Sequence, residues 1–421
     1  MPIKENSIEQ AIALIGIGKY GSSSLPENLE QSITTDLESP EIPNIQKGAF
    51  WGAIFLKGFE SKSEKNIQNH FKIHTVEDII SKLCKTKDIK ILNLIHRLLQ
   101  GFTLDLEESY TIGRFLFKEK FSLEEEFDIG LITSILRFRH ETLEEYLGLL
   151  KSIEDLYYHK WNAKIISSIS ENFIILTEPF DGINRSYLLT PLIGRKLIEE
   201  GYIPFFIVSK NPGPKFHYNL FDLAKFLDAP FLQDPSEIEK YMNQNSLKNS
   251  DFHGLYIDVK NLSSILDIWI ERRKLLKKRP FLSTLERIYN PINAKTQFFS
   301  AFHPPYLEII TEILQKKEIP NIVGIRRGEE GGLSFSFNKR NEILISKKKE
   351  NGYQTETKIF YEPFPQEVKI KPDLNTNAQI ILSYLREKTI PKNLKEQSYI
   401  EKQIQHLLEM YFYAINKIKS N

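Results

Sequence analysis

The first part of the chain repeats apolar residues at the spacing of an amphipathic helix. Apolar residues recur three and four positions apart through residues 76–83 and 91–99, which places them along one face of a helix. Proline is confined there to positions 2, 26, 40 and 43, where loops or first helical turns accommodate it. The pattern predicts helices through most of residues 7–165.

Beyond residue 166, short apolar runs alternate with helical patterns. Strands are expected over residues 173–176, 205–208, 255–259, 297–301 and 321–325, and helices over 190–201, 262–276, 306–315 and the tail 375–421. Alternation of strand, helix and strand favours a parallel sheet. The predicted fold class is therefore α/β: a helical N-terminal domain followed by an α/β domain with a mainly parallel sheet.

The helical part contains two similar segments, residues 13–65 and 96–153. Each has an acidic turn (residues 25–29 and 104–108), followed by a glycine that opens an apolar helix with a basic end (residues 48–58 and 130–142). Any two amphipathic helices resemble each other. The similarity of the two segments is therefore explained either by duplication or by coincidence. The expected division is an extra helical segment over 1–70, a helical N-terminal domain over 71–165 and an α/β domain with C-terminal helices over 166–421.

Composition narrows the class of protein. The 421 residues carry a net charge of +1, so nucleic-acid or membrane binding would need a local basic patch. The single cysteine, Cys84, excludes an internal disulfide framework and a CxxC site. The apolar runs are too short to span a bilayer, and the polar start is unlike a signal peptide. We expect a soluble, cytoplasmic protein that does not bind membranes.

Several segments resemble a known family. Residues 99–104 (LQGFTL) and 137–142 (RFRHET) match first-domain signatures, and Asp181-Gly182 before Thr190 takes the place of a donor loop. Arg273 and Arg279 before residues 290–291 (NP) match an arginine-rich helix and its following turn. Over roughly residues 96–365 the chain resembles anthranilate phosphoribosyltransferase and the wider glycosyltransferase family 3. The resemblance implies a homodimer formed by first-domain helices. It also implies transfer of a phosphoribosyl or related pentosyl group to an aromatic or nitrogenous acceptor.

The donor site departs from the family pattern. The family's GTGGDG loop corresponds to residues 177–182 (TEPFDG), where Pro179 has no N–H to donate and Phe180 fills the space of a phosphate. Glu178 adds a negative charge facing a polyanion. The KHGN run becomes residues 208–211 (VSKN), and the Mg²⁺-binding acidic pair falls on Gly332-Leu333, which cannot hold the ion. No metal ligands or certain cofactor are therefore assigned, and Mg²⁺ would need other ligands.

A divergent subgroup paralogous to the biosynthetic enzyme shares these changes and a Gly-x-Glu-Gly turn, which residues 327–332 (RGEEGG) resemble. Nucleic-acid binding has been proposed for some of its members. From this resemblance we expect the chain to be closer to this subgroup than to the enzyme of tryptophan synthesis.

Candidate ligand-binding residues follow from these matches. The donor or phosphate candidates are Asp181, Gly182, Arg185, Thr190 and Lys210, and the acceptor candidates are Asn211 and Arg273. The basic run at 272–279 has a charge of +6 in eight residues and supplies a polyanion patch of Arg272, Lys274, Lys277, Lys278 and Arg279.

Ordinary structural roles are the alternatives: a helix-capping Asp-Gly turn, surface lysines on a loop, and a solvated charge run. No side chain is assigned a catalytic role. Two functions remain open. One is a pentosyltransferase with a remodelled donor site, which binds a phosphorylated sugar or another anion. The other is a non-enzymatic paralogue that binds nucleic acid or another polyanion.

Overall fold

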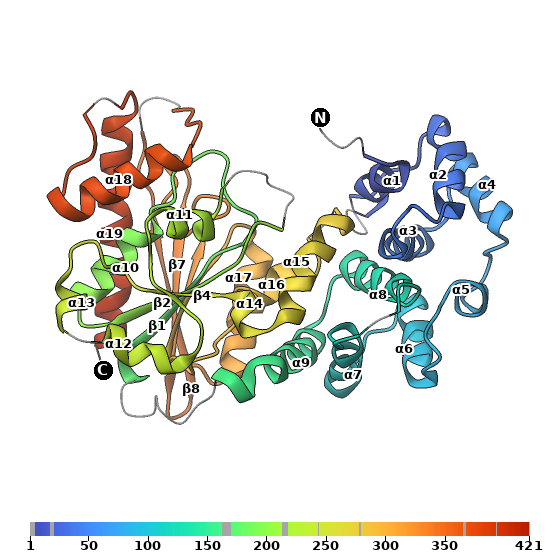
Figure 1. Cartoon of the computed structure of the whole chain (residues 1–421), viewed down its shortest axis with the longest axis horizontal. Coiled ribbons are helices and arrows are strands. Elements are labelled where there is room, and N and C mark those ends of the chain that lie inside the picture. Colours follow the sequence, from blue (N-terminus) through green and yellow to red (C-terminus); the bar gives the residue numbers. More distant parts are fainter. Residues whose placement is uncertain are drawn as a thin grey trace. The chain divides into compact units, whose positions relative to one another are not determined.

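The computed structural model describes residues 5–16, 21–120, 122–161, 170–212, 218–242, 244–277, 279–364, 368–392 and 394–420. The chain divides into two compact units (Figure 1). The helical unit comprises Met1–Asp155 with Ile268–Ser283, and the α/β unit comprises Leu156–Asp267 with Thr284–Asn421. The segment Ile268–Ser283 therefore packs with helices that are far from it in sequence. Within the described residues, no helix combines the length and hydrophobicity needed to cross a lipid bilayer.

The helical unit consists of short helices joined by capped turns. Its elements are α1 (Ser7–Ile15), η1 (Glu27–Leu29), α2 (Glu30–Glu38), α3 (Asn44–Lys57), α4 (Lys62–Phe71), α5 (Val76–Lys82), α6 (Ile89–Leu99), α7 (Leu106–Leu116), α8 (Glu126–Arg139) and the first part of α9 (Leu143–Trp161). Capping boxes begin α4, α5 and α7, where side chains satisfy backbone N–H groups that lack a partner within the helix.

Helices α3 and α8 pack at their glycines. A Cβ atom at Gly48 would lie 1.9 Å from the carbonyl oxygen of Phe127, and one at Gly130 would lie 1.9 Å from that of Ile45. Phe127 precedes Gly130 by three residues, and Ile45 precedes Gly48 by three. Each glycine therefore meets the same position of the opposite helix, which makes the contact symmetric. The absence of side chains lets the two backbones approach closely.

The two similar segments also share a buried glutamate. Glu64 accepts the backbone N–H of Leu25 over 3.0 Å, and Glu145 accepts that of Leu104 over 2.9 Å. Both glutamate side chains are fully buried. Each leucine begins the acidic turn of its own segment. In both segments the same hydrogen bond therefore connects this turn to the helix that carries the glutamate.

The α/β unit carries an eight-stranded sheet among its described residues. The strands are β1 (Phe173–Thr177), β2 (Ile203–Val208), β3 (Phe231–Leu232), β4 (Leu255–Asp258), β5 (Thr296–Ala301), β6 (Asn321–Arg326), β7 (Asn341–Lys349) and β8 (Gly352–Phe360). Their order is β3-β4-β2-β1-β5-β6-β7-β8. The first six in this order run parallel, and the β7–β8 hairpin continues the sheet antiparallel.

Helices cover both faces of this sheet. The remaining elements are η3 (Ser170–Asn172), α10 (Thr190–Glu199), α11 (Leu220–Phe226), η4 (Pro235–Glu237), α12 (Ile238–Tyr241), α13 (Gln244–Lys248), α14 (Val259–Leu262), α15 (Ser264–Leu276), α16 (Leu282–Leu285), α17 (Pro304–Lys316), α18 (Leu374–Glu387) and α19 (Gln397–Lys419). In Figure 1, α10, α18 and α19 lie on one side of the strands and α17 lies on the other. Apolar side chains of α10, α11, α18 and α19 form one core with the sheet, as expected for parallel strands buried on both faces.

The predicted fold class is confirmed. Each of the five predicted strands coincides with an observed strand to within two residues at its ends, and the predicted helices correspond to α10, α15, α17, α18 and α19. The strands β3, β7 and β8 were not among those predicted. The strand β3 has only two residues, which leave no alternation to detect.

Candidate functional site

The loop after β1 is the first candidate site, because ligands of parallel α/β sheets bind where strands end. Pro179, Phe180, Asp181 and Gly182 are all buried, and Phe180 is only 4% exposed. The backbone N–H of Phe180 donates to the carboxylate of Glu286 over 3.2 Å. This N–H group therefore has a partner within the protein, whereas a phosphate-binding loop directs such groups at its ligand.

Two asparagines bond to the carbonyl groups of the same loop. The Nδ2 atom of Asn219 donates to the carbonyl oxygens of Phe180 and Ser209, both over 2.8 Å. The Nδ2 atom of Asn211 donates to the carbonyl oxygen of Asp181 over 3.1 Å. The predicted acceptor residue Asn211 thus contacts the predicted donor loop directly, and its amide supports the loop backbone.

Glu178 places a carboxyl group beneath this loop. Its Oε2 atom accepts the hydroxyl of Thr190 over 3.2 Å and the backbone N–H of Leu333 over 3.1 Å. Its Oε1 atom is buried without a hydrogen-bond partner among the described residues. Burial raises the pKa of Glu178 to about 8, although both hydrogen bonds act in the opposite direction. At neutral pH the group is therefore mainly an uncharged carboxylic acid.

The turn after β6 closes over the same loop. Gly331 has a φ of +94°, and a Cβ atom there would lie 2.4 Å from the carbonyl oxygen of Gly182. A Cβ atom at Gly332 would lie 3.2 Å from Oε2 of Glu178. Leu333 is fully buried. The positions that correspond to the acidic pair of the family therefore pack against the β1 loop. No group of three or more His, Cys, Asp or Glu side chains suited to a metal ion occurs in the part of the chain that the structure describes.

The donor candidates fall into two groups. Asp181, Gly182 and Thr190 are buried around the end of β1. Arg185 is exposed on the loop between β1 and α10. Lys210 is half-buried and lies 3.1 Å from the carboxylate of Asp267. The structure thus brings three of the candidates together in the protein interior and leaves Arg185 accessible to a ligand.

The acceptor candidate Arg273 lies in the helical unit. It is 4% exposed, and its guanidinium donates to the hydroxyl of Ser283 over 2.9 Å. The other acceptor candidate, Asn211, belongs to the α/β unit.

The basic run at 272–279 is less exposed and less positive than its sequence indicates. Arg272 is buried, pairs with Glu126 at 3.4 Å and lies over the ring of Trp269. It therefore faces the protein interior and not a surface patch, because its aliphatic and planar parts pack against an aromatic residue. The remaining candidates are Arg279, which is half-buried, and Lys278, which lies outside the described residues.

The two described lysines of the run have acidic partners. Lys274 lies 2.9 Å from Glu271. Lys277 lies 3.5 Å from Glu5 and 3.3 Å from Glu9. These contacts reduce the positive field that the run can direct at a polyanion.

Sequence reasoning missed the residues that hold the β1 loop in place. Asn219 is part of an Asn-x-x-Asp capping box at the start of α11, a signal visible in the sequence that indicates only the cap. Asn377 of α18 accepts the backbone N–H of Leu188 over 2.8 Å and donates to its carbonyl over 2.9 Å. No local signal reveals the partners of Glu286 or Asn377, because these lie more than 100 residues away in the sequence.

Comparison with known proteins supports the fold. Anthranilate phosphoribosyltransferase from Saccharomyces cerevisiae, solved in complex with PRPP and Mg, matches with a TM-score of 0.52. The match covers 79% of this chain and 93% of the yeast chain at 13% identity. The chain has the fold of an anthranilate phosphoribosyltransferase. The enzyme from Thermus thermophilus is similar over 77% of this chain and 99% of its own, at 16% identity and a TM-score of 0.46.

Sequence comparison adds a relative without a known function. An uncharacterized protein of Aquifex aeolicus (strain VF5) is 24% identical over 286 residues, which cover 66% of this chain and 80% of the relative. No family model matches the chain. The similarity to the solved enzymes therefore concerns the fold, and the activity has to be argued from the site.

Proposed function

We propose that this chain uses the phosphoribosyltransferase fold to bind an anionic ligand without transferring a phosphoribosyl group. The burial of Phe180 carries the proposal. Its ring occupies the end of β1, where a glycine-rich loop would leave space for phosphate oxygens. The N–H of Phe180 is already bonded to Glu286, so it does not contribute to a phosphate cradle.

Electrostatics supports the same conclusion. The carboxyl group of Glu178 lies under the loop and accepts hydrogen bonds from the hydroxyl of Thr190 and the backbone N–H of Leu333. A polyanion brought to this position would disfavour its ionised form further and would gain no attraction from it. Arg185 is the exposed cationic side chain of this loop. We therefore assign the contact with an anionic ligand to Arg185, whose guanidinium offers paired donors to phosphate or carboxylate oxygens.

The second candidate function is phosphoribosyl transfer through a remodelled donor site. One observation favours it: Arg185 is exposed on the segment between β1 and α10, shortly after residues 177–182, so a phosphorylated sugar bound there would meet a cation. In this case Arg185 and Lys210 would bind the donor, and Asn211 would contact an aromatic or nitrogenous acceptor. Mg²⁺ would then need ligands other than those at Gly332 and Leu333.

Binding of nucleic acid by the basic run 272–279 has less support. Arg272 is buried, and Lys274 and Lys277 have carboxylate partners. Few charges of the run remain to neutralise phosphates, so binding through it would be weak.

Isothermal titration of the full chain with inorganic pyrophosphate and with phosphoribosyl pyrophosphate tests the proposal. We expect both to bind without release of pyrophosphate in the presence of anthranilate. Arg185→Ala should weaken binding by about tenfold, the effect of losing one charge-assisted contact. Arg114→Ala is the matched control, because that arginine is exposed on α7 of the helical unit.

The outcomes separate the three functions. Release of pyrophosphate with an aromatic amine would establish the transferase and overturn the proposal. Equal binding by wild type and Arg185→Ala, or no binding, would overturn the assigned anion contact. Binding of single-stranded DNA that falls with salt and with Lys277→Ala would support the nucleic-acid function instead.

A further inference from the structure

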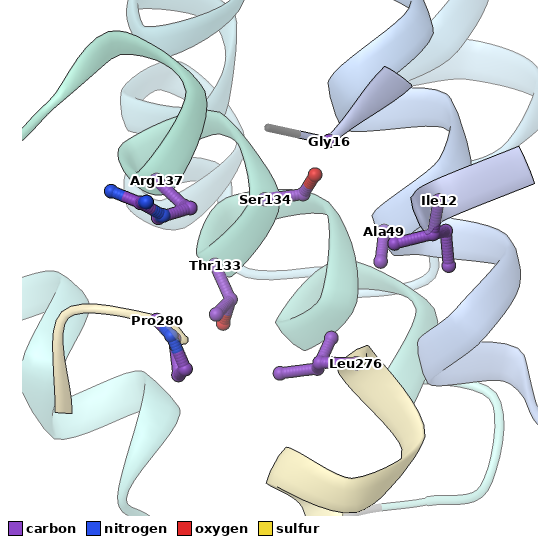
Figure 2. Close-up of a pocket in the computed structure, with 8 residues that line it drawn as sticks. All are labelled: Ile12, Gly16, Ala49, Thr133, Ser134, Arg137, Leu276 and Pro280. Carbon is purple, nitrogen blue, oxygen red and sulfur yellow. The ribbon is translucent and has the colours of Figure 1, made fainter. Parts of the chain in front are cut away.

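A pocket lies within the helical unit, where Thr133, Ser134 and Arg137 line it from α8 (Figure 2). Its volume of about 20 Å³ has room for one or two water molecules. It is therefore too small for an organic ligand, and the outer edge of the sheet in the α/β unit offers the larger binding surface.

Strand β8 is an edge strand of nine residues. It comes last in the order of the sheet, and its pairing with β7 runs without interruption from Asn341 opposite Phe360 to Lys349 opposite Gly352. Proteins usually protect such an edge with a proline, a bulge or a very short strand. Residues 352–360 contain no proline, and their register has no bulge. Among the described residues, β8 is thus a regular edge with no strand on its outer side.

The alternation of the antiparallel ladder determines which backbone groups of β8 point outward. The N–H of Lys348 on β7 donates to the carbonyl oxygen of Pro320, away from β8, over 2.8 Å. Tyr353 lies opposite Lys348, so these two form a pair without hydrogen bonds, and Tyr353 turns its own N–H and C=O outward. The same holds for every second residue that follows: Thr355, Thr357 and Ile359. A strand added to the edge would form its hydrogen bonds with these residues.

Charges of both signs lie along this edge. Lys358 lies 4.1 Å from the centre of the Tyr413 ring and has no acidic partner among the described residues. Glu356 pairs with Lys417 at 3.1 Å, in a contact that is partly exposed. An added strand would match these charges if it placed a carboxylate opposite Lys358 and a cation opposite Glu356.

We propose that β8 pairs with β8 of a second copy of this chain, antiparallel and with Thr357 opposite itself. This register places Glu356 of each copy opposite Lys358 of the other, so opposite charges meet twice. It also joins outward-pointing backbone groups to outward-pointing backbone groups. A pair centred on Glu356 or on Lys358 would instead set like charges opposite each other, which is unfavourable.

Exposed apolar side chains support the same register. Ile359 and Tyr361 are 49% and 57% exposed. The register sets Ile359 opposite Thr355 and Tyr361 opposite Tyr353, and such β-branched and aromatic pairs stabilise neighbouring strands. A pair centred on Thr355 would set Ile359 opposite Asn351, outside the strand, and would leave both apolar side chains uncovered.

The opposite edge of the sheet limits the assembly to two copies. That edge is β3, which has only two residues. Among the described residues the sheet therefore has one long edge, and pairing through it forms a closed two-fold dimer. A single pair of strands buries less than the area of about 1,000 Å² that stable interfaces need. We expect a monomer at micromolar concentration and a dissociation constant of about 0.1–1 mM.

Disulfide formation in the full chain at about 0.3 mM tests the register. Two copies of Thr357→Cys would place their cysteines about 5.5 Å apart between Cα atoms, which suits a disulfide. Thr355→Cys is the matched control, because this position is exposed on the same strand but lies about 13 Å along the strand from its own copy. We expect Thr357→Cys to cross-link about tenfold faster on non-reducing gels.

Wild type measures any contribution of Cys84, whose thiol should react slowly because burial raises its pKa. Equal rates in the two cysteine variants would overturn the proposal. Cross-linking only in a mixture of Thr355→Cys and Thr357→Cys would also overturn it, because it would mean a pair centred on Glu356.

Sedimentation equilibrium from about 0.05 to 1 mM tests the charge pairs. Lys358→Glu would face Glu356 of the other copy, and Glu356→Lys would face Lys358, so each variant should associate about tenfold more weakly than wild type. In an equimolar mixture of the two variants each glutamate faces a lysine, and association should return. Lys87→Glu is the control, because it changes the net charge equally at an exposed position of the helical unit. No association of wild type, or a mixture that associates no better than either variant alone, would contradict the pairing.

Discussion

Glu178 and Leu333 join the end of β1 to the turn after β6. The Oε2 atom of Glu178 accepts the backbone N–H of Leu333 over 3.1 Å, between residues that are 155 positions apart. The same oxygen accepts the hydroxyl of Thr190 at the start of α10. One carboxyl group therefore connects three elements at the carboxyl edge of the sheet, in the place where this fold receives a ligand.

The ionisation of Glu178 should make stability depend on pH. Burial raises its pKa from 4.5 to about 8. Between these values the unfolded carboxyl loses its proton while the folded one keeps it, so the free energy of unfolding falls as pH rises, by up to about 1.4 kcal/mol per pH unit. Glu178→Gln removes this dependence. In urea denaturation from pH 4.5 to pH 9, the free energy of unfolding of the variant should rise relative to that of wild type until about pH 8.

The control for this prediction lies in the shape of the curve. A glutamine places its NH2 group where Oε1 of Glu178 has no partner among the described residues, a cost that does not vary with pH. The difference between the two proteins should therefore change between pH 4.5 and 8 and stay constant above. A difference that is constant throughout would mean that Glu178 ionises normally in the folded protein.

The closest helix contact of the helical unit should not tolerate a methyl group. A Cβ atom at Gly130 would lie 1.9 Å from the carbonyl oxygen of Ile45 and 2.9 Å from the backbone nitrogen of Ala49. Backbone cannot move aside as a flexible side chain does, so α3 and α8 must separate. We expect Gly130→Ala to lower the free energy of unfolding by about 2–3 kcal/mol. Ser32→Ala, at an exposed position of α2, should leave it nearly unchanged in the same denaturation experiment.

The packing of α3 on α8 affects which surfaces are available for dimerisation. The family resemblance predicts a homodimer through first-domain helices. In this chain α3 packs on α8 through Gly48 and Gly130, so the facing sides of these two helices are already buried within one chain. A homodimer through the same face of α8 would require α3 to leave it. We therefore expect sedimentation velocity to show a monomer of 49.2 kDa. A dimer at micromolar concentration would contradict this.

The sequence predicted the fold wherever a periodic pattern carried it. The strand that contains Ile174 and Leu176 is an apolar run buried on both faces, and such runs indicate parallel strands. The hairpin of β7 and β8 turns at Glu350 and Asn351, between the paired residues Lys349 and Gly352, and an Asn-Gly sequence is typical of such turns. Both signals are local, so they need no knowledge of the tertiary structure.

The site was harder to predict, because its contacts are distant in sequence. The type of residue indicates that Phe180 fills space, but not that Glu286 binds its N–H from 106 positions away. The charge of residues 272–279 is plain in the sequence. The pairing of Lys277 with Glu5, 272 positions away, is not. Net charge along a run therefore overstates the field when acidic partners come from another segment.

The two buried glutamates of the helical unit provide a test of the repeat. Glu64 pairs with Lys57 at 3.0 Å, and Glu145 pairs with Arg139. Each carboxylate also accepts backbone N–H groups, so a glutamine at either position loses an acceptor and the ion pair together. We expect Glu64→Gln and Glu145→Gln each to lower the free energy of unfolding by about 2–3 kcal/mol. Glu107→Gln should change it by less than about 1 kcal/mol, because its pair with Lys151 is exposed. A large effect at one glutamate and none at the other would show that the two segments do not carry the same structural unit.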